Sequence, residues 1–225
     1  LDLLQDMAWE HATQLGVSVT QLMENNQTWV LSRFHLIIDQ PIFQGSTITV
    51  RTWPVKVYRL FAIRDFEMLS ADGTTLARAT SGWLVLSRPD LRPLRPEEIL
   101  DPIELYPHRS IEDDFEALPR PQKTVEESLF QVRWHELDIN NHVNNTVYPL
   151  WALESLSESF HREHRCRSLE IQFTGMALPG EQVISRRSDA LESDFPGFIH
   201  QIVNAQSGKE LARLRTGWIK RPLAD

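Results

Sequence analysis

The chain contains the segment Gly73-Thr-Thr-Leu-Ala-Arg-Ala-Thr-Ser-Gly-Trp-Leu84 and repeats it, with few changes, as Gly208-Lys-Glu-Leu-Ala-Arg-Leu-Arg-Thr-Gly-Trp-Ile219. The glycines and tryptophans of the two copies are 135 residues apart (208 − 73 and 218 − 83). The same offset pairs Gly45 with Gly180, and Ile38 with Phe173, without a gap. A single register that holds across residues 38–84 indicates an internal duplication.

Each copy carries the same order of predicted elements. Apolar residues at helical spacing come first, in 1–15 and again in 147–160. Runs rich in β-branched and aromatic residues follow and predict antiparallel strands. One helix followed by such a meander predicts an α+β fold, two tandem hot-dog domains in which a sheet wraps around a helix, forming a pseudo-dimer. The expected strands are 29–39, 46–57, 58–69 and 75–87, then 167–175, 181–192, 197–205 and 210–220.

The predicted domains are an N-terminal hot-dog domain over 1–88 and a C-terminal one over 125–225. Seven of the thirteen prolines fall in 89–124, which we interpret as a linker rather than a packed element. The second copy has a further strand, 128–134, before its helix, whereas the first begins at Leu1. We therefore expect the natural protein to begin upstream, with the corresponding strand.

Composition limits the class of protein. The chain is 41% hydrophobic and 24% charged, which is ordinary for a globular protein, and its formal net charge of -8 argues against nucleic-acid binding. No stretch approaches the length of a membrane span, and the acidic start does not resemble a signal peptide. The single cysteine, Cys166, fits a reducing compartment, so we expect a cytoplasmic protein with no membrane partner.

The densest polar cluster is Trp134-His-Glu-Leu-Asp-Ile-Asn-Asn-His-Val-Asn-Asn-Thr-Val-Tyr148. Asp138, Asn140 and His142 alternate within it, so an extended loop would turn all three side chains toward one side. Asn144 or Asn145 can cap the helix that follows, whose unpaired first amides would stabilise a developing oxyanion. Taken alone, Asp138 or Asn140 is better explained as part of a capping loop.

The whole cluster supports a more specific interpretation. Asp-x-Asn-x-His-Val-Asn-Asn, followed by an aromatic residue and Trp-x-x-Glu, resembles the signature of plant and bacterial acyl-acyl carrier protein (acyl-ACP) thioesterases. The duplication and strand order agree with that family over nearly the whole chain. The resemblance implies hydrolysis of a fatty acyl thioester on ACP, which ends chain elongation, with no metal or organic cofactor. An acyl-CoA thioesterase and a non-catalytic acyl-binding hot-dog protein are the alternatives.

By the same resemblance, His142 would orient or deprotonate water, or assist the departing thiolate. Asp138 would hold the geometry and charge of the site, and Asn140 would position the loop and hydrogen-bond the substrate or His142. Histidine suits this chemistry because imidazole changes its protonation near neutral pH. The expected substrate-binding residues are Val143, Asn144, Asn145 and Trp151. Four tryptophans could line an acyl tunnel, although a core role is the simpler interpretation: Trp9, Trp83, Trp151 and Trp218.

One position departs from the family pattern. The glutamate expected on the strand after the helix aligns with Met176, which cannot accept a proton. Either the register slips locally, another carboxylate serves, or catalysis is weakened, and the gap-free repeat makes a slip the least favoured. Glu154 is the first alternative carboxylate, although a helix glutamate held by a polar neighbour is the simpler interpretation. Acyl chain length and a homodimeric state stay open.

Overall fold

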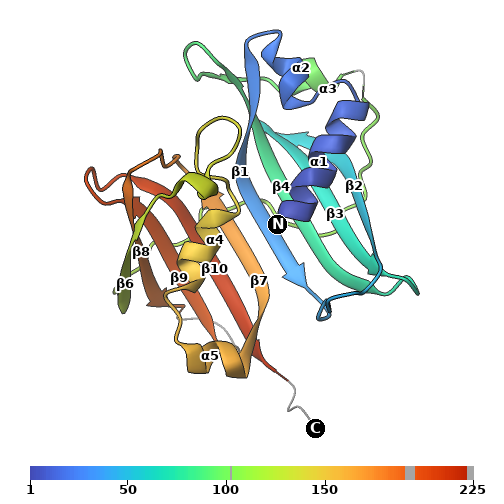
Figure 1. The fold of residues 1–225 in the computed structure, drawn as a ribbon. Helices are drawn as coiled ribbons and strands as arrows, with labels where there is room; N and C mark the ends of the chain where they lie inside the picture. The colour runs from blue at the N-terminus through green and yellow to red at the C-terminus, as the bar shows by residue number, and fades with distance from the viewer. Residues whose placement is uncertain (102, 191–195, 222–225) are drawn as a thin grey trace. The chain divides into compact units, whose positions relative to one another are not determined.

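The computed structural model describes residues 1–101, 103–190 and 196–221 (Figure 1). The chain divides into two compact units, Leu1–Glu116 and Ala117–Asp225. Two parts of the predictions lie outside the described residues, namely the end of the predicted strand 181–192 and residues 222–225 of the predicted C-terminal domain.

The first unit is an antiparallel sheet with strand order β2-β3-β4-β1, and the short strand β5 pairs with β4. Helix α1 lies over this sheet (Figure 1) and buries Leu4 and Ala8, one turn apart, as their spacing predicts. Ser18 and Gln21 form a capping box that starts α2. The elements are α1 (Asp2–Gln14), α2 (Val19–Met23), β1 (Gln27–Ile38), β2 (Ile48–Tyr58), β3 (Phe61–Ser70), β4 (Thr75–Ser87), β5 (Pro93–Leu94) and α3 (Glu97–Leu100).

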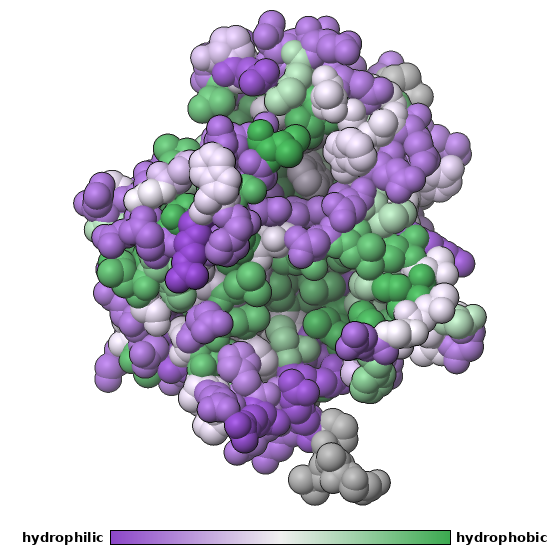
Figure 2. Space-filling view, viewed as in Figure 1, coloured by the Kyte–Doolittle hydropathy of each residue, from purple (hydrophilic) through white to green (hydrophobic). Residues whose placement is uncertain are grey.

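The second unit is an antiparallel sheet with strand order β7-β10-β9-β8-β6. Helix α4 packs on β8, β9 and β10. Hydrophilic side chains cover α5 on the face seen in Figure 2, while its Phe160 packs on the apolar cluster of Leu156, Phe198 and Trp218. The elements are β6 (Glu126–Gln131), the 3-10 turn η1 (Trp134–Glu136), α4 (Val147–Leu153), α5 (Glu158–Glu163), β7 (His164–Phe173), β8 (Gln182–Asp189), β9 (Gly197–Asn204) and β10 (Glu210–Lys220).

The duplication extends to the backbone conformation. Gly45 and Gly180, which share one register position, have φ values of 84° and 78°. Gly73 and Gly208 likewise have φ values of 86° and 68°. Glycine adopts this left-handed region without the steric cost that other residues meet, so the same turns recur in both copies.

Two local predictions differ from the structure. Residues 89–116 of the predicted linker belong to the first unit, where Ser110 Oγ donates to the Ala79 carbonyl at 2.7 Å and Leu94 packs on the core. The linker is therefore a packed segment, because its apolar and polar side chains find partners on the sheet between its prolines.

The predicted second helix, 147–160, is also divided. Ser155 Oγ donates to the Ala152 carbonyl at 2.6 Å, and Ser157 Oγ accepts from the Phe160 amide at 3.2 Å to start a new helix. Serine side chains compete in this way with helical backbone bonds. In the described part of the chain, every helix is too short or too polar to cross a membrane.

Candidate active site

The polar cluster of the second unit folds into a tight turn at Asp138–His142. Asp138 Oδ1 accepts hydrogen bonds from the amides of Asn140 at 2.8 Å and His142 at 3.1 Å. The Asp138 amide donates to the His142 carbonyl at 2.7 Å, and Asn141 closes the turn with φ of 58°. The prediction of an extended loop is therefore wrong, because the aspartate carboxylate folds the backbone back on itself.

The three polar residues of this turn have different surroundings. Asp138 acts on the backbone, so it sets the shape of the turn. His142 is half-buried and Asn140 is exposed. Within the described residues, neither the His142 imidazole nor the Asn140 carboxamide has a hydrogen-bond partner, which leaves both able to bind water or a ligand.

The start of helix α4 differs from the expected oxyanion site. Asn144 Oδ1 accepts from the Thr146 amide at 3.1 Å, and the Asn144 carbonyl accepts from the Val147 amide at 3.0 Å. The amide of Asn144 itself donates to the Glu136 carbonyl at 2.8 Å. These groups are paired, so the prediction of unpaired first amides is wrong for them. Asn144 instead stabilises the turn that leads into the helix.

A backbone segment after β7 supports the turn. The Val143 amide donates to the Ala177 carbonyl at 3.1 Å, and the Ala177 amide donates to Tyr148 Oη at 2.9 Å. The next amide, that of Leu178, donates to Glu181 Oε2 at 2.9 Å. Met176 adjoins this ladder of bonds and is 43% exposed. The departure from the family pattern therefore lies beside the turn.

Glu181 is a carboxylate that the sequence interpretation missed. Burial raises the pKa of the Tyr148 hydroxyl to about 12, and the negative charges of Glu181 and Asp138 add to the rise. Both carboxylates therefore lie close enough to act on one buried hydroxyl. The available signal was the position of Glu181, five residues after Met176 and directly after the turn glycine Gly180.

The structure does not bring Glu154 to the turn. It is exposed at the C-terminal end of α4, whereas the turn precedes the N-terminal end. Seven helical residues span roughly 10 Å at 1.5 Å per residue. Glu154 was predicted as an alternative carboxylate, but its position favours the simpler interpretation of a helix-end glutamate.

Two predicted substrate-binding residues lie in the core. Val143 and Trp151 are each 3% exposed. The Trp151 ring contacts Tyr148 at 5.3 Å and stacks on Phe130 at 6.2 Å between centroids. Both side chains are therefore packed in the core. Of the four predicted substrate-binding residues, only Asn144 and Asn145 are half-buried and keep part of their surface open to solvent.

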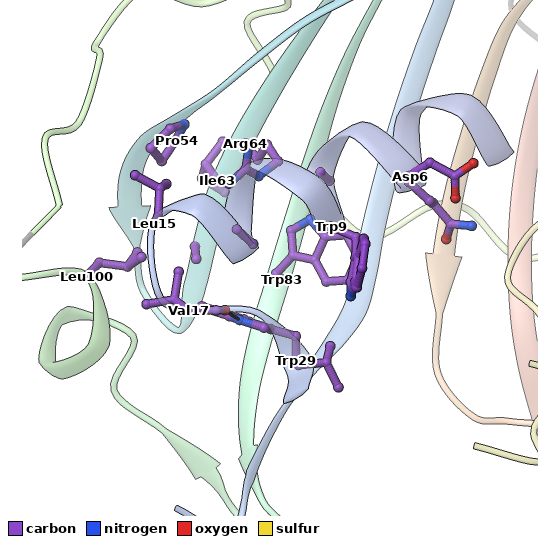
Figure 3. Close-up of a pocket in the computed structure, with 15 residues that line it drawn as sticks. Asp6, Trp9, Leu15, Val17, Trp29, Pro54, Ile63, Arg64, Trp83 and Leu100 are labelled. Carbon is purple, nitrogen blue, oxygen red and sulfur yellow. Dashed lines mark hydrogen bonds between the residues drawn. The ribbon is translucent and has the colours of Figure 1, made fainter. Parts of the chain in front are cut away.

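A separate feature of the first unit is a cavity of about 290 Å³ between α1 and the sheet (Figure 3). Trp9 and Trp83, two of the predicted tunnel tryptophans, line it, whereas Trp151 and Trp218 are buried in the second unit. The rest of the lining is mostly apolar, with one half-buried cation, Arg64. Apolar cavities with a few polar groups are typical of small-molecule sites.

Comparison with known proteins identifies the family. The model of the acyl-ACP thioesterase N-terminal domain matches residues 1–103, and the model of the C-terminal domain matches residues 120–220. The chain belongs to the acyl-ACP thioesterase family.

Individual relatives agree. The chain is 26% identical to the chloroplastic palmitoyl-ACP thioesterase of Cuphea hookeriana over 96% of its own length and 55% of that protein, so it spans about half of this relative. Its fold is similar to the 12:0-ACP thioesterase from Umbellularia californica, with a TM-score of 0.87 at 22% identity over 98% and 88% of the two chains. An acyl-ACP thioesterase from Bacteroides thetaiotaomicron gives 0.81 at 25% identity over 97% and 87%. The predicted tandem hot-dog fold is confirmed.

Proposed function

We propose that this protein hydrolyses fatty acyl-ACP thioesters to free fatty acid and ACP. The observation that carries the proposal is the turn at Asp138–His142, which presents a half-buried imidazole with no hydrogen-bond partner among the described residues. An imidazole held this way can exchange a proton with water near neutral pH. Membership of the acyl-ACP thioesterase family supports a thioester as the substrate.

The reaction follows from the groups at the turn. His142 takes a proton from water while the water oxygen bonds to the thioester carbonyl carbon, and the carbonyl electrons move to oxygen. The intermediate then collapses, the carbon–sulfur bond breaks, and the departing thiolate receives the proton from His142. Asn140 can donate a hydrogen bond from its carboxamide to the oxyanion, while Asp138 keeps the turn closed.

Glu181 makes a structural contact near Met176 and does not replace the proton acceptor that the family pattern expects at that position. Its carboxylate holds the Leu178 amide, two residues beyond Met176. The same segment accepts the Val143 amide, one residue after His142. Glu181 therefore helps to position the turn through this backbone segment, and we assign it no proton transfer.

The carrier and the location remain part of the proposal. Membership of the family favours ACP over coenzyme A as the carrier. Two relatives are named for different acyl chains, palmitoyl and 12:0, so the family leaves the chain length open. A cytoplasmic location rests on the single cysteine, Cys166, because reducing compartments keep thiols free. A homodimer stays a prediction.

The proposed function is tested by measuring the release of free thiol from acyl-ACP and from acyl-CoA. Both substrates carry the same acyl group, and the full-length polypeptide is the enzyme. We expect turnover with acyl-ACP and a lower kcat/KM with acyl-CoA. The reverse preference would assign the protein to acyl-CoA hydrolysis. Absence of turnover on both substrates across a panel of chain lengths would contradict the proposal.

A second candidate is a non-catalytic acyl-binding protein. The exposed Met176, at the position where the family pattern expects a glutamate, favours it. This candidate predicts saturable binding of acyl-ACP with no release of thiol. Binding and turnover measured on one preparation therefore separate the two functions.

A further inference from the structure

His200 on β9 is a fully buried histidine whose ring has one hydrogen-bond partner among the described residues. Its Nε2 lies 3.0 Å from Thr216 Oγ1, and the Trp218 Nε1–H donates to the same hydroxyl oxygen at 3.0 Å. The Thr216 hydroxyl has no third partner in the described part of the chain, so its own O–H donates to His200 Nε2. Burial keeps the ring neutral by lowering the pKa of His200 to about 3. The ring proton is therefore on Nδ1, where the N–H is buried and has no partner among the described residues.

Two further polar groups lie on the same face of the sheet. Arg187 on β8 is directly opposite His200 in the ladder, and Ser185 precedes Arg187 by two residues, so all three side chains point to one face. Ser185 is fully buried, and neither its Oγ nor the buried Nε of Arg187 has a hydrogen-bond partner among the described residues. The charge of Arg187 also lowers the pKa of His200, as expected for a guanidinium near the ring. Three neighbouring groups can therefore each donate a hydrogen bond, and none of them bonds to another.

The positive charge of Arg187 is not neutralised by a neighbouring carboxylate. Its guanidinium carbon lies 4.9 Å from the centroid of the Phe198 ring, and no acidic side chain of the described residues forms an ion pair with it. Glu126 is opposite Arg187 on β6, but it is exposed. The adjacent arginine, Arg186, points to the other face of the sheet and pairs with the Glu127 carboxylate at 2.9 Å. Of two successive arginines, the fold thus pairs one and leaves the other beside two neutral donors.

The surroundings of these donors select the kind of ligand. Ile202, opposite Ser185, and Leu214, opposite His200, are both fully buried, so the donors lie among packed apolar side chains. Buried donors without an acceptor are costly, and one small anion can accept from several of them at once. Its attraction to a guanidinium also strengthens where water is scarce. These features favour a single-atom anion.

We propose that the second unit binds a chloride ion through the Arg187 Nε–H, the His200 Nδ1–H and the Ser185 hydroxyl. The ion would join β8 to β9 on the face of the sheet where Phe198 packs against Phe160 of α5. Because only the folded chain assembles the three donors, chloride would stabilise the fold by mass action, independently of the proposed hydrolysis.

The NMR line width of chloride in a solution of the full chain near neutral pH tests the proposal, because binding to a protein broadens the chloride line. We expect the wild type to broaden the line and bromide to reverse the broadening by displacing chloride. In Arg187→Met the affinity for chloride should fall at least about tenfold, the ratio for loss of one charge-assisted contact, and Ser185→Ala should retain part of it. Arg186→Met removes the same charge from the opposite face of β8, so it is the matched control and should bind chloride as the wild type does.

A wild-type chain without bromide-sensitive broadening would show that the three donors hold water only, and this result alone would overturn the proposal. Equal losses in Arg187→Met and Arg186→Met would trace the binding to overall charge and also overturn it. If thermal unfolding shows that Arg187→Met does not fold, Ser185→Ala carries the test, and unchanged affinity in that variant would contradict the site. Chloride binding is measured without a thioester, so its failure leaves the proposed hydrolysis to be judged by its own assay.

Discussion

Trp83 in the first unit and Trp218 in the second occupy the same register position of the repeat, yet one lines a cavity and the other fills a core. Their Nε1 groups donate to a hydroxyl two residues earlier, that of Ser81 at 2.9 Å and that of Thr216 at 3.0 Å. Trp218 is 3% exposed and meets the Phe160 ring edge-on at 5.2 Å. The strands are thus alike, and the difference arises on the helical side.

The helices explain the difference in packing. In the first unit, α1 contributes the small residues Ala8 and Ala12 to the cavity wall. In the second unit, α5 contributes Phe160, which packs on the sheet residue Phe198 at 5.2 Å. Small side chains on a helix leave space that aromatic ones fill. A duplicated sheet therefore borders a ligand-sized cavity in one copy and a closely packed aromatic core in the other.

Position 65 and its counterpart 200 show a second contrast. Asp65 is fully buried and accepts from Arg109 Nε at 3.0 Å and from the Ser110 amide at 2.7 Å. His200 is equally buried but bonds through Nε2 to Thr216 Oγ1 at 3.0 Å. One unit thus holds an ion pair where the other holds a ring kept neutral by its surroundings.

The largest expected effect is loss of the ion pair. Arg109→Met leaves the Asp65 carboxylate buried without a counter-ion, and we expect the free energy of unfolding to fall by about 3–5 kcal/mol. Chemical denaturation of the wild type and of Arg109→Met measures this difference in the free energy of unfolding. Adding Asp65→Asn removes the orphaned charge, as in the second unit, and should recover most of the loss. A fall of less than about 1 kcal/mol, the value typical of an exposed pair, would contradict the contrast between the units.

A smaller effect is expected from acidification. Burial, with a contribution from Arg187, lowers the pKa of His200 from 6.5 to about 3. Between these two pH values His200 is protonated in the unfolded chain but neutral in the folded chain. The contribution of His200 to the free energy of unfolding is therefore fully present above pH 6.5 and is lost as the pH falls toward 3. Between neutral pH and about pH 5, His200→Asn should lose about 2 kcal/mol less than wild type. Parallel stability curves for the two proteins would refute the assignment.

The fold could be predicted from the sequence because the patterns that indicate its strands and turns are local and occur in both copies of the repeat. Glycines at turn positions and β-branched strands repeat at an offset of 135, which predicted β4 and β10 within a residue of their observed ends. The packed segment 89–116 was not predicted, because prolines suggest a linker while Ser110 finds its partner Ala79 thirty-one residues away.

The site was predicted in its residues but not in its geometry. The motif selected Asp138, Asn140 and His142, whereas alternation suggested an extended loop. The closed turn depends on a side chain bonding to its own backbone, which no periodicity reports. The support from Glu181 depends on how the irregular segment between β7 and β8 folds back toward the turn. The cavity around Arg64 depends on how α1 lies on the sheet, which no single segment encodes.

If the turn at Asp138–His142 carries thioester hydrolysis, removing the His142 imidazole in His142→Ala must slow the release of thiol. We expect acyl-ACP turnover to fall by about 10²–10⁴-fold, the range for loss of a general acid–base group, with thermal unfolding unchanged. His135→Ala, at an exposed histidine of the same loop, should retain the wild-type rate. A His142→Ala protein that turns over as fast as wild type would contradict the account.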